Sequence, residues 1–156
     1  MKTYSMLLMA GLLLAGSSGA RAQDGNAEER SYFARPDCSK IKNVEKIRQN
    51  YLSALRSDNP GVVQSALAQV AYISMCMPDF SSGVMTATVA SLAATGNTQA
   101  VRYRAYLTAL AIENPGMFAA EREGKYENGE QLYSALSTRL QAALLSYSDR
   151  KYVRPE

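Results

Sequence analysis

The stretch VRYRAYLTALAI, residues 101–112, decides the fold predicted for this chain. Spaced at 100° per residue, its apolar side chains fall on two opposite faces of a helix. These stripes are Val101, Ala105, Ala109 and Ile112 on one face and Tyr103, Tyr106, Leu107 and Leu110 on the other. A helix with one solvent-exposed face needs only one apolar stripe, so two stripes indicate a helix that is covered on both sides. The stretch therefore predicts an all-helical domain with a central helix inside 97–114, and we expect the last helix to cover Tyr106 and Leu107.

Other helices flank this central one, in the ranges 39–56, 60–77, 81–94 and 130–146, with a short helix from 115 to about 123. Asn59 followed by Pro60 is a helix start, because Asn caps a helix and Pro suits its first position. Gly96 is placed for a left-handed C-terminal cap. The end helices are one-sided, and in the last one the inward arc is Leu132, Leu136, Leu140, Ala143, Leu144 and Tyr147.

The first 22 residues have the pattern of a cleaved signal peptide. Lys2 precedes the apolar run 6–14, and Ala20-Arg21-Ala22 matches a cleavage site. This pattern predicts an exported protein, periplasmic or secreted, with no membrane span after processing. The polar stretch 23–36 is expected to be a disordered leader, 37–148 the helical-repeat domain, and 149–156 a flexible tail.

Charge argues against nucleic acid as a partner. The chain has 17 basic and 14 acidic residues, a net charge of +3. Loss of Lys2 and Arg21 with the signal leaves 15 − 14 = +1. A nearly neutral surface gives no electrostatic reason to bind nucleic acid or an anionic membrane.

Missing residue types narrow the chemistry further. The chain has no histidine, the commonest general base and a frequent zinc ligand, and it has no phosphate-binding loop. We therefore predict no catalytic residues, no metal and no cofactor. Two alternatives stay open: a small carboxylate-based envelope enzyme using Glu121, Glu123, Glu127 and Glu130, and a soft-metal (copper) carrier using Met75, Cys76, Met77 and Met85.

The two cysteines, Cys38 and Cys76, predict a disulfide. An even pair in an oxidising compartment is typical of one. Cys38 begins the first expected helix, Cys76 ends the second, and the turn near Asp58 lies almost midway between them. In an antiparallel hairpin the two positions meet at the same open end.

A weak internal repeat runs through the first four helices. A shift of 39 residues lays Val62 on Val101, Ala66 on Ala105 and Ile73 on Ile112. The segments after 59–61 and 96–97 resemble HEAT-like repeats, whose second helix often follows a turn with Val-Arg and then Ala and Leu. The resemblance covers roughly 39–114. It implies a short right-handed helical stack, whereas the alternative is an orthogonal helical bundle.

HEAT-like arrays present surfaces to partners, and their second helices line the concave side. The resemblance therefore implies an exported scaffold, without catalysis, that binds another envelope protein or peptide. The expected partner surface is formed by Gln64, Gln69, Arg102, Tyr103 and Arg104. Arg102 and Arg104 lie about 200° apart on a helix, so only one of them can face a given partner fully.

Overall fold

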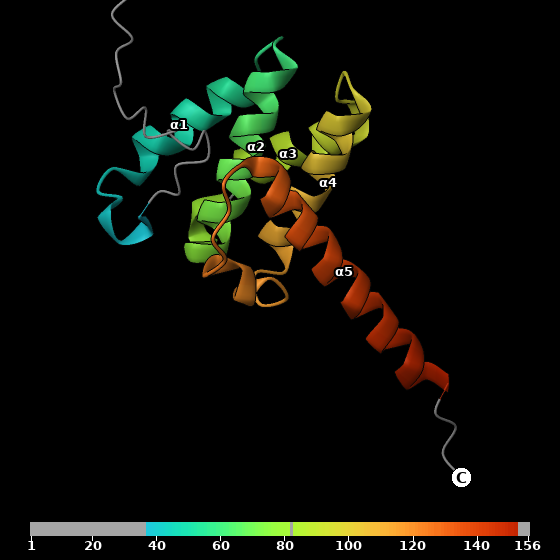
Figure 1. Ribbon diagram of the computed structural model, residues 1–156. Helices are drawn as coiled ribbons and strands as arrows, with labels where there is room; N and C mark the ends of the chain where they lie inside the picture. Colours follow the sequence, from blue (N-terminus) through green and yellow to red (C-terminus); the bar gives the residue numbers. More distant parts are fainter. Residues whose placement is uncertain (1–36, 82, 153–156) are drawn as a thin grey trace, which may run out of the picture.

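The computed structural model describes residues 37–81 and 83–152, and every regular element within them is a helix. The α-helices are α1 (Val44–Leu55), α2 (Pro60–Cys76), α3 (Val84–Thr95), α4 (Gln99–Glu113) and α5 (Gly129–Tyr152) (Figure 1). Short 3-10 turns are η1 (Cys38–Lys40), η2 (Pro78–Ser81) and η3 (Ala119–Arg122). The prediction of an all-α domain is confirmed. The expected signal peptide (1–22) and leader (23–36) lie outside the described residues.

Local capping decides where the first two helices begin. The Asn59 side chain accepts a hydrogen bond of 2.9 Å from the Gly61 N–H, and Pro60 is the first residue of α2, as predicted. The expected start of the first helix at residue 39 is wrong. The Asn43 side chain accepts from the Lys46 N–H at 3.0 Å, which satisfies a donor of the first turn and starts α1 at residue 44.

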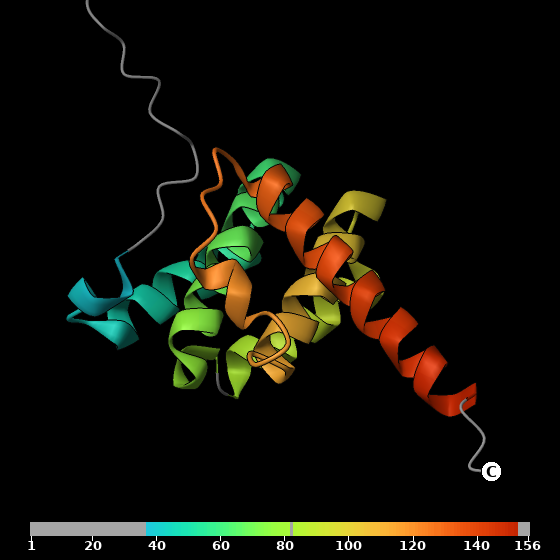
Figure 2. The same ribbon diagram turned by 60° about the horizontal axis from the view of Figure 1, so that its bottom comes forward.

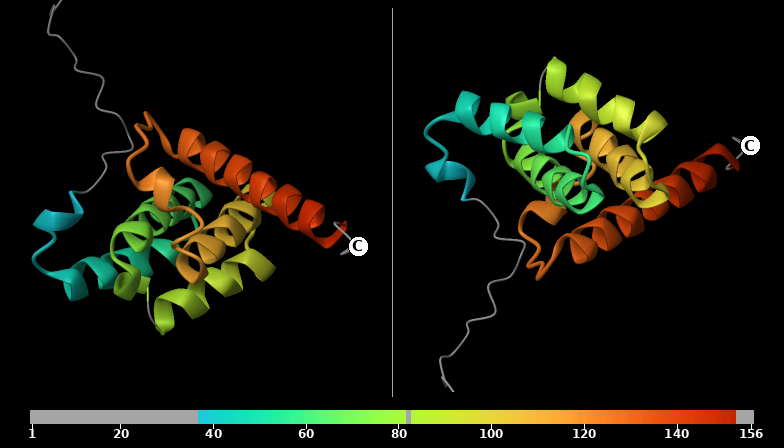
Figure 3. Two further views of the ribbon diagram at one scale, coloured as in Figure 1. Left: turned by 90° about the horizontal axis from the view of Figure 1, so that it is seen from below. Right: turned by 90° about the horizontal axis from the view of Figure 1, so that it is seen from above.

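Three layers of helices make up the body (Figure 3). α1 and α3 lie on one side, α2 and α4 form the middle layer, and α5 crosses the opposite side together with η3. The middle layer therefore has a partner on each of its two faces. Ala66 of α2 and Ala105 of α4, which the internal repeat aligned, are both buried.

The most enclosed helix is α2 rather than the predicted α4. Ten of its 17 residues are buried, and they fall on every side of the helix. On α4, Leu107 is buried as expected, but Tyr103 and Tyr106 are 50% and 49% exposed. The second stripe of α4 is thus only partly covered, because α5 crosses this helix instead of running along it (Figure 3).

Gly96 closes the tight connection between α3 and α4 without the expected left-handed conformation. Its φ is −53° and its ψ is 142°. A Cβ atom at this position would lie 2.6 Å from the Leu92 carbonyl oxygen and 2.7 Å from Val101 Cγ1. Glycine is required here by close approach of the neighbouring turn and side chain, not by backbone geometry.

The longest helix, α5, leaves the body midway along its length (Figures 1 and 2). Leu132 and Leu136 are fully buried, whereas Leu144 is 58% and Tyr147 64% exposed. The expectation that this whole arc packs inward is therefore wrong. The helix also runs to Tyr152, past the expected end at 146 and into the predicted tail. Within residues 37–81 and 83–152, no helix is at once long and apolar enough to cross a membrane.

Candidate functional site

The predicted partner surface is divided between two sides of α4. The Arg102 guanidinium turns back to the α3–α4 connection, where Nη1 donates a hydrogen bond of 2.6 Å to the Gly96 carbonyl. Arg104 points to the other side and forms an ion pair with Glu130 of α5. The two arginines thus face apart, as their spacing predicted, and they belong to different surfaces.

The first half of α5 covers the face of α2 and α4 that was expected to stay open. The buried side chains Leu132, Tyr133 and Leu136 hold α5 there. The Tyr103 hydroxyl donates a hydrogen bond of 2.9 Å to Ser137 Oγ, and the Arg104 guanidinium lies 5.5 Å from the centroid of the Tyr133 ring. Tyr103 and Arg104 therefore contact this chain's own last helix, which corrects the expectation of a free concave face.

Two small grooves remain at the borders of this contact. The α4–α5 groove has a volume of about 290 Å³ and is lined by Tyr103, Arg104, Glu130, Tyr133, Ser134, Ser137, Thr138 and Gln141. The α2–α5 groove, of about 220 Å³, is lined by Gly61, Gln64, Ser65, Ala68, Arg104, Asn128, Gly129 and Glu130. The ion pair of Arg104 and Glu130 borders both grooves. Gln64 therefore lies close to Arg104, whereas Gln69 belongs to neither lining.

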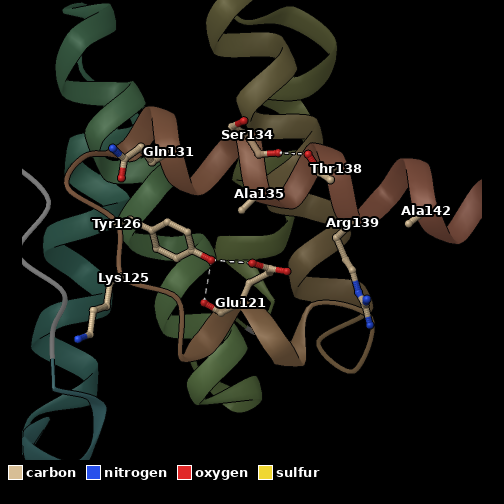
Figure 4. Close-up of a pocket in the computed structure, with 9 residues that line it drawn as sticks. All are labelled: Glu121, Lys125, Tyr126, Gln131, Ser134, Ala135, Thr138, Arg139 and Ala142. Atoms are coloured by element: carbon tan, nitrogen blue, oxygen red, sulfur yellow. Dashed lines mark hydrogen bonds between the residues drawn. The ribbon is translucent and has the colours of Figure 1, made fainter.

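A third groove follows the other flank of α5, beside η3 (Figure 4). Its volume is about 590 Å³, and Glu121, Lys125, Tyr126 and Arg139 line it with the polar side of α5. The Tyr126 hydroxyl points to Glu121 and donates a hydrogen bond of 2.7 Å to Oε2. Arg139 Nε donates to the Met117 carbonyl at 3.0 Å, which ties α5 to the segment before η3.

The glutamates considered as catalytic residues of a carboxylate-based enzyme contact different residues. Glu121 accepts from Tyr126, Glu127 accepts from Gln131 Nε2 at 3.1 Å, and Glu130 pairs with Arg104. Glu121 lines the groove beside η3, whereas Glu130 lines the two grooves on the opposite flank of α5. A carboxylate pair for glycoside cleavage must face one substrate across one cleft, and these two residues do not.

The sulfur-containing residues named for a copper carrier are mostly core residues. Met75 and Met85 are buried, and Met77 is partly buried against the same core. Met side chains fill irregular core space well, which explains their number here. Over the described residues, no group of three or more His, Cys, Asp or Glu side chains is placed to hold a metal ion.

Sequence reasoning missed the exposed half of α5. Leu144, Leu145 and Tyr147 are each more than half exposed, and Leu144 lies one helical turn beyond Gln141 of the α4–α5 groove. Periodicity identified the apolar arc but could not tell that the body ends before it. The structure gives the reason: α5 has 24 residues while the other α-helices described have 12 to 17, and the helix expected from the sequence ended at residue 146.

Comparison with known proteins adds no relative: no protein-family model, curated protein or solved structure matches this chain.

Proposed function

We propose that this protein is an exported helical scaffold that binds an apolar, acid-flanked helix of another envelope protein. The binding surface is the exposed arc of α5, formed by Leu140, Ala143, Leu144 and Tyr147, hereafter the α5 arc. One observation carries the proposal: an apolar stripe that begins in the core at Leu132 and Leu136 continues into solvent, and no element within residues 37–81 and 83–152 covers it there. The α5 arc is presented in solvent, and a helix of the partner covers its apolar side chains.

Burial of apolar surface supplies the affinity. Full burial of one large apolar side chain contributes about 1.5–3 kcal/mol. Leu144 and Tyr147 each have more than half of this surface left to bury. Part of the gain offsets the entropy lost on association, so moderate affinity is expected. Single exposed apolar residues are common on protein surfaces, but a continuous stripe is typical of an interaction site.

The net charge of the second half of α5, read from its sequence, favours one class of partner helix. From residue 139 to 152 the basic residues are Arg139, Arg150 and Lys151, and the acidic one is Asp149, which gives 3 − 1 = +2. An apolar partner helix with acidic flanks complements this charge, whereas a basic one is repelled. Association is then expected to slow as salt concentration rises.

The sequence pattern at the N-terminus favours a partner in the envelope. Lys2, the apolar run 6–14 and Ala20-Arg21-Ala22 together match the pattern of an export signal with a cleavage site. The buried side chains Leu132, Tyr133 and Leu136 hold the first half of α5 on the body. The second half is thereby displayed at a defined angle. A rigid display of a binding helix lowers the entropy cost of binding.

Capture followed by a defined binding assay tests this proposal. The mature chain, residues 23–156, is immobilised and exposed to a solubilised envelope fraction, and a captured protein is then purified for titration. Leu144→Glu is compared with Val84→Glu on α3, because Leu144 and Val84 are equally exposed at 58%. We expect Leu144→Glu to weaken binding at least about tenfold, since it puts a charge into the apolar contact, and Val84→Glu to leave it unchanged.

Both variants must melt at the parent temperature for this comparison to count. Equal affinity of parent and Leu144→Glu for every captured protein would overturn the proposal. If the parent chain is a dimer by light scattering and Leu144→Glu is a monomer, the α5 arc binds a second copy of this chain, and the proposed envelope partner is wrong. Capture of some protein by itself decides nothing.

A second matched pair tests whether the α4–α5 groove belongs to the same interface. Tyr103 lines this groove, whereas the equally exposed Tyr106 is not part of its lining. If the partner reaches from the α5 arc into the groove, Tyr103→Ala weakens binding more than Tyr106→Ala. Equal losses would restrict the interface to the α5 arc.

A further inference from the structure

The two cysteines lie next to each other in the folded chain. Cys38 opens η1, Cys76 is the last residue of α2, and their thiols share a hydrogen bond. Both side chains are half-buried and pack against the edge of the core. The contact joins residues that are 76 − 38 = 38 positions apart in the sequence, so it depends on the α1–α2 hairpin.

The Cys76 side of this contact is firmly anchored. The Met77 N–H donates a hydrogen bond of 2.7 Å to the Ile73 carbonyl and closes the last turn of α2. Just beyond it, Arg48 of α1 donates from Nε to the Phe80 carbonyl at 3.0 Å, with its guanidinium 6.0 Å from the Phe80 ring centroid. The end of the α1–α2 hairpin is therefore a fixed point.

On the Cys38 side, the neighbouring polar side chains form contacts within their own turn. Asp37 accepts from the Ser39 N–H at 3.1 Å and forms an ion pair of 2.8 Å with Lys40. Both of these contacts are exposed to solvent, where such interactions stabilise little. A covalent bond at Cys38 would give this first turn of the domain a lasting attachment to the core.

We propose that Cys38 and Cys76 are a modification site, at which an intramolecular disulfide clamps η1 to the end of α2. Formation of the S–S bond removes one proton and one electron from each thiol. A disulfide donor, such as oxidised glutathione or the disulfide form of an oxidoreductase, takes up the two electrons and becomes a pair of thiols. The reaction passes through a mixed disulfide between one cysteine and the donor. The second cysteine then attacks this mixed disulfide and releases the donor as a thiol. This inference does not depend on the partner proposed above.

The environment of Cys38 determines how quickly the reaction proceeds. Burial and the hydrogen bond with the Cys76 thiol raise the pKa of Cys38 to about 12. The thiolate, which is the reacting form, is therefore scarce at Cys38 at neutral pH. Slow spontaneous oxidation and strong acceleration by an oxidoreductase are expected.

Oxidation of the purified chain tests the inference directly. The reduced protein, residues 23–156, is incubated with oxidised glutathione with and without a disulfide oxidoreductase, then acid-quenched and weighed by mass spectrometry. We expect a product lighter by two hydrogen atoms whose digest contains Cys38 linked to Cys76. We also expect a melting temperature about 10 °C above that of the reduced chain, because the bond closes a long loop. Dithiothreitol should reverse both changes.

The double variant Cys38→Ser/Cys76→Ser is the control, and its melting temperature should be insensitive to dithiothreitol. Stable glutathione adducts on either cysteine, disulfide-linked dimers, or thiols that stay unreacted with the oxidoreductase would each overturn the inference. If the oxidised chain melts no higher than the reduced chain, the claim that the disulfide stabilises the attachment of η1 to α2 is wrong.

Discussion

Thr108 and Tyr133 share a buried hydrogen bond of 2.8 Å between α4 and α5. Thr108 Oγ1 also donates to the Arg104 carbonyl at 2.8 Å, so the Tyr133 hydroxyl is the donor of the shared bond. Both residues are almost completely excluded from solvent. This pair and the apolar residues around it attach the first half of α5 to the body, and thereby determine where the α5 arc points.

Removing either partner of this hydrogen bond should have unequal effects on stability. Thr108→Val leaves the Tyr133 hydroxyl buried without its acceptor, which should lower the free energy of unfolding by about 1–3 kcal/mol. Tyr133→Phe removes the donor, and Thr108 keeps its bond to Arg104, so the loss should be about 0.5–1.5 kcal/mol. Urea denaturation measures both. The opposite ranking would contradict the donor assignment.

Alkaline pH should weaken the fold through Tyr133. Burial raises the pKa of Tyr133 above its ordinary value of 10.0, so the folded chain holds this proton more tightly than the unfolded chain. The contribution to stability is complete below about pH 10 and is lost as pH rises further, by up to about 1.4 kcal/mol per pH unit. Tyr133→Phe should show a shallower decline in urea midpoints between about pH 9 and 11. Parallel curves for the two proteins would contradict this assignment.

Ala105 is a site where a larger side chain cannot fit. It is fully buried in α4. Ala105→Leu should therefore overpack the core and cost about 1–3 kcal/mol. Gln141→Leu, an exposed change on α5, should alter stability by no more than about 0.5 kcal/mol. Similar thermal shifts in the two variants would refute the assignment of faces on α4 and α5.

Gly96 and Gly116 should respond differently to alanine. At Gly96 a Cβ would meet a backbone carbonyl and Val101, so Gly96→Ala should cost about 1–3 kcal/mol. Gly116 has no atom within 4 Å of that position, and Gly116→Ala should be neutral or stabilising by up to about 1 kcal/mol. Equal effects on the free energy of unfolding would show that close approach is not why residue 96 is glycine.

Local features of the sequence predicted much of the fold. Helix starts and apolar stripes depend on residues within one or two turns, as the Asn59 cap of α2 shows. The start of α1 was misplaced because two capping residues lie close together: Asp37 caps the 3-10 turn η1, and Asn43 caps α1 itself. Spacing on one helix was enough to predict that Arg102 and Arg104 face apart.

By itself, the sequence determined that the chain is helical, where most helices lie, and which side chains form apolar stripes. Only the tertiary structure decided which stripe is covered. It placed α2 in the centre, laid the first half of α5 over Tyr103 and Arg104, and left Leu144 and Tyr147 in solvent. The physical reason is that periodicity encodes a face of one helix, whereas burial of that face depends on where the other helices end. The sequence did predict that Cys38 and Cys76 meet at the open end of a helical hairpin, and in the folded chain the two thiols lie next to each other.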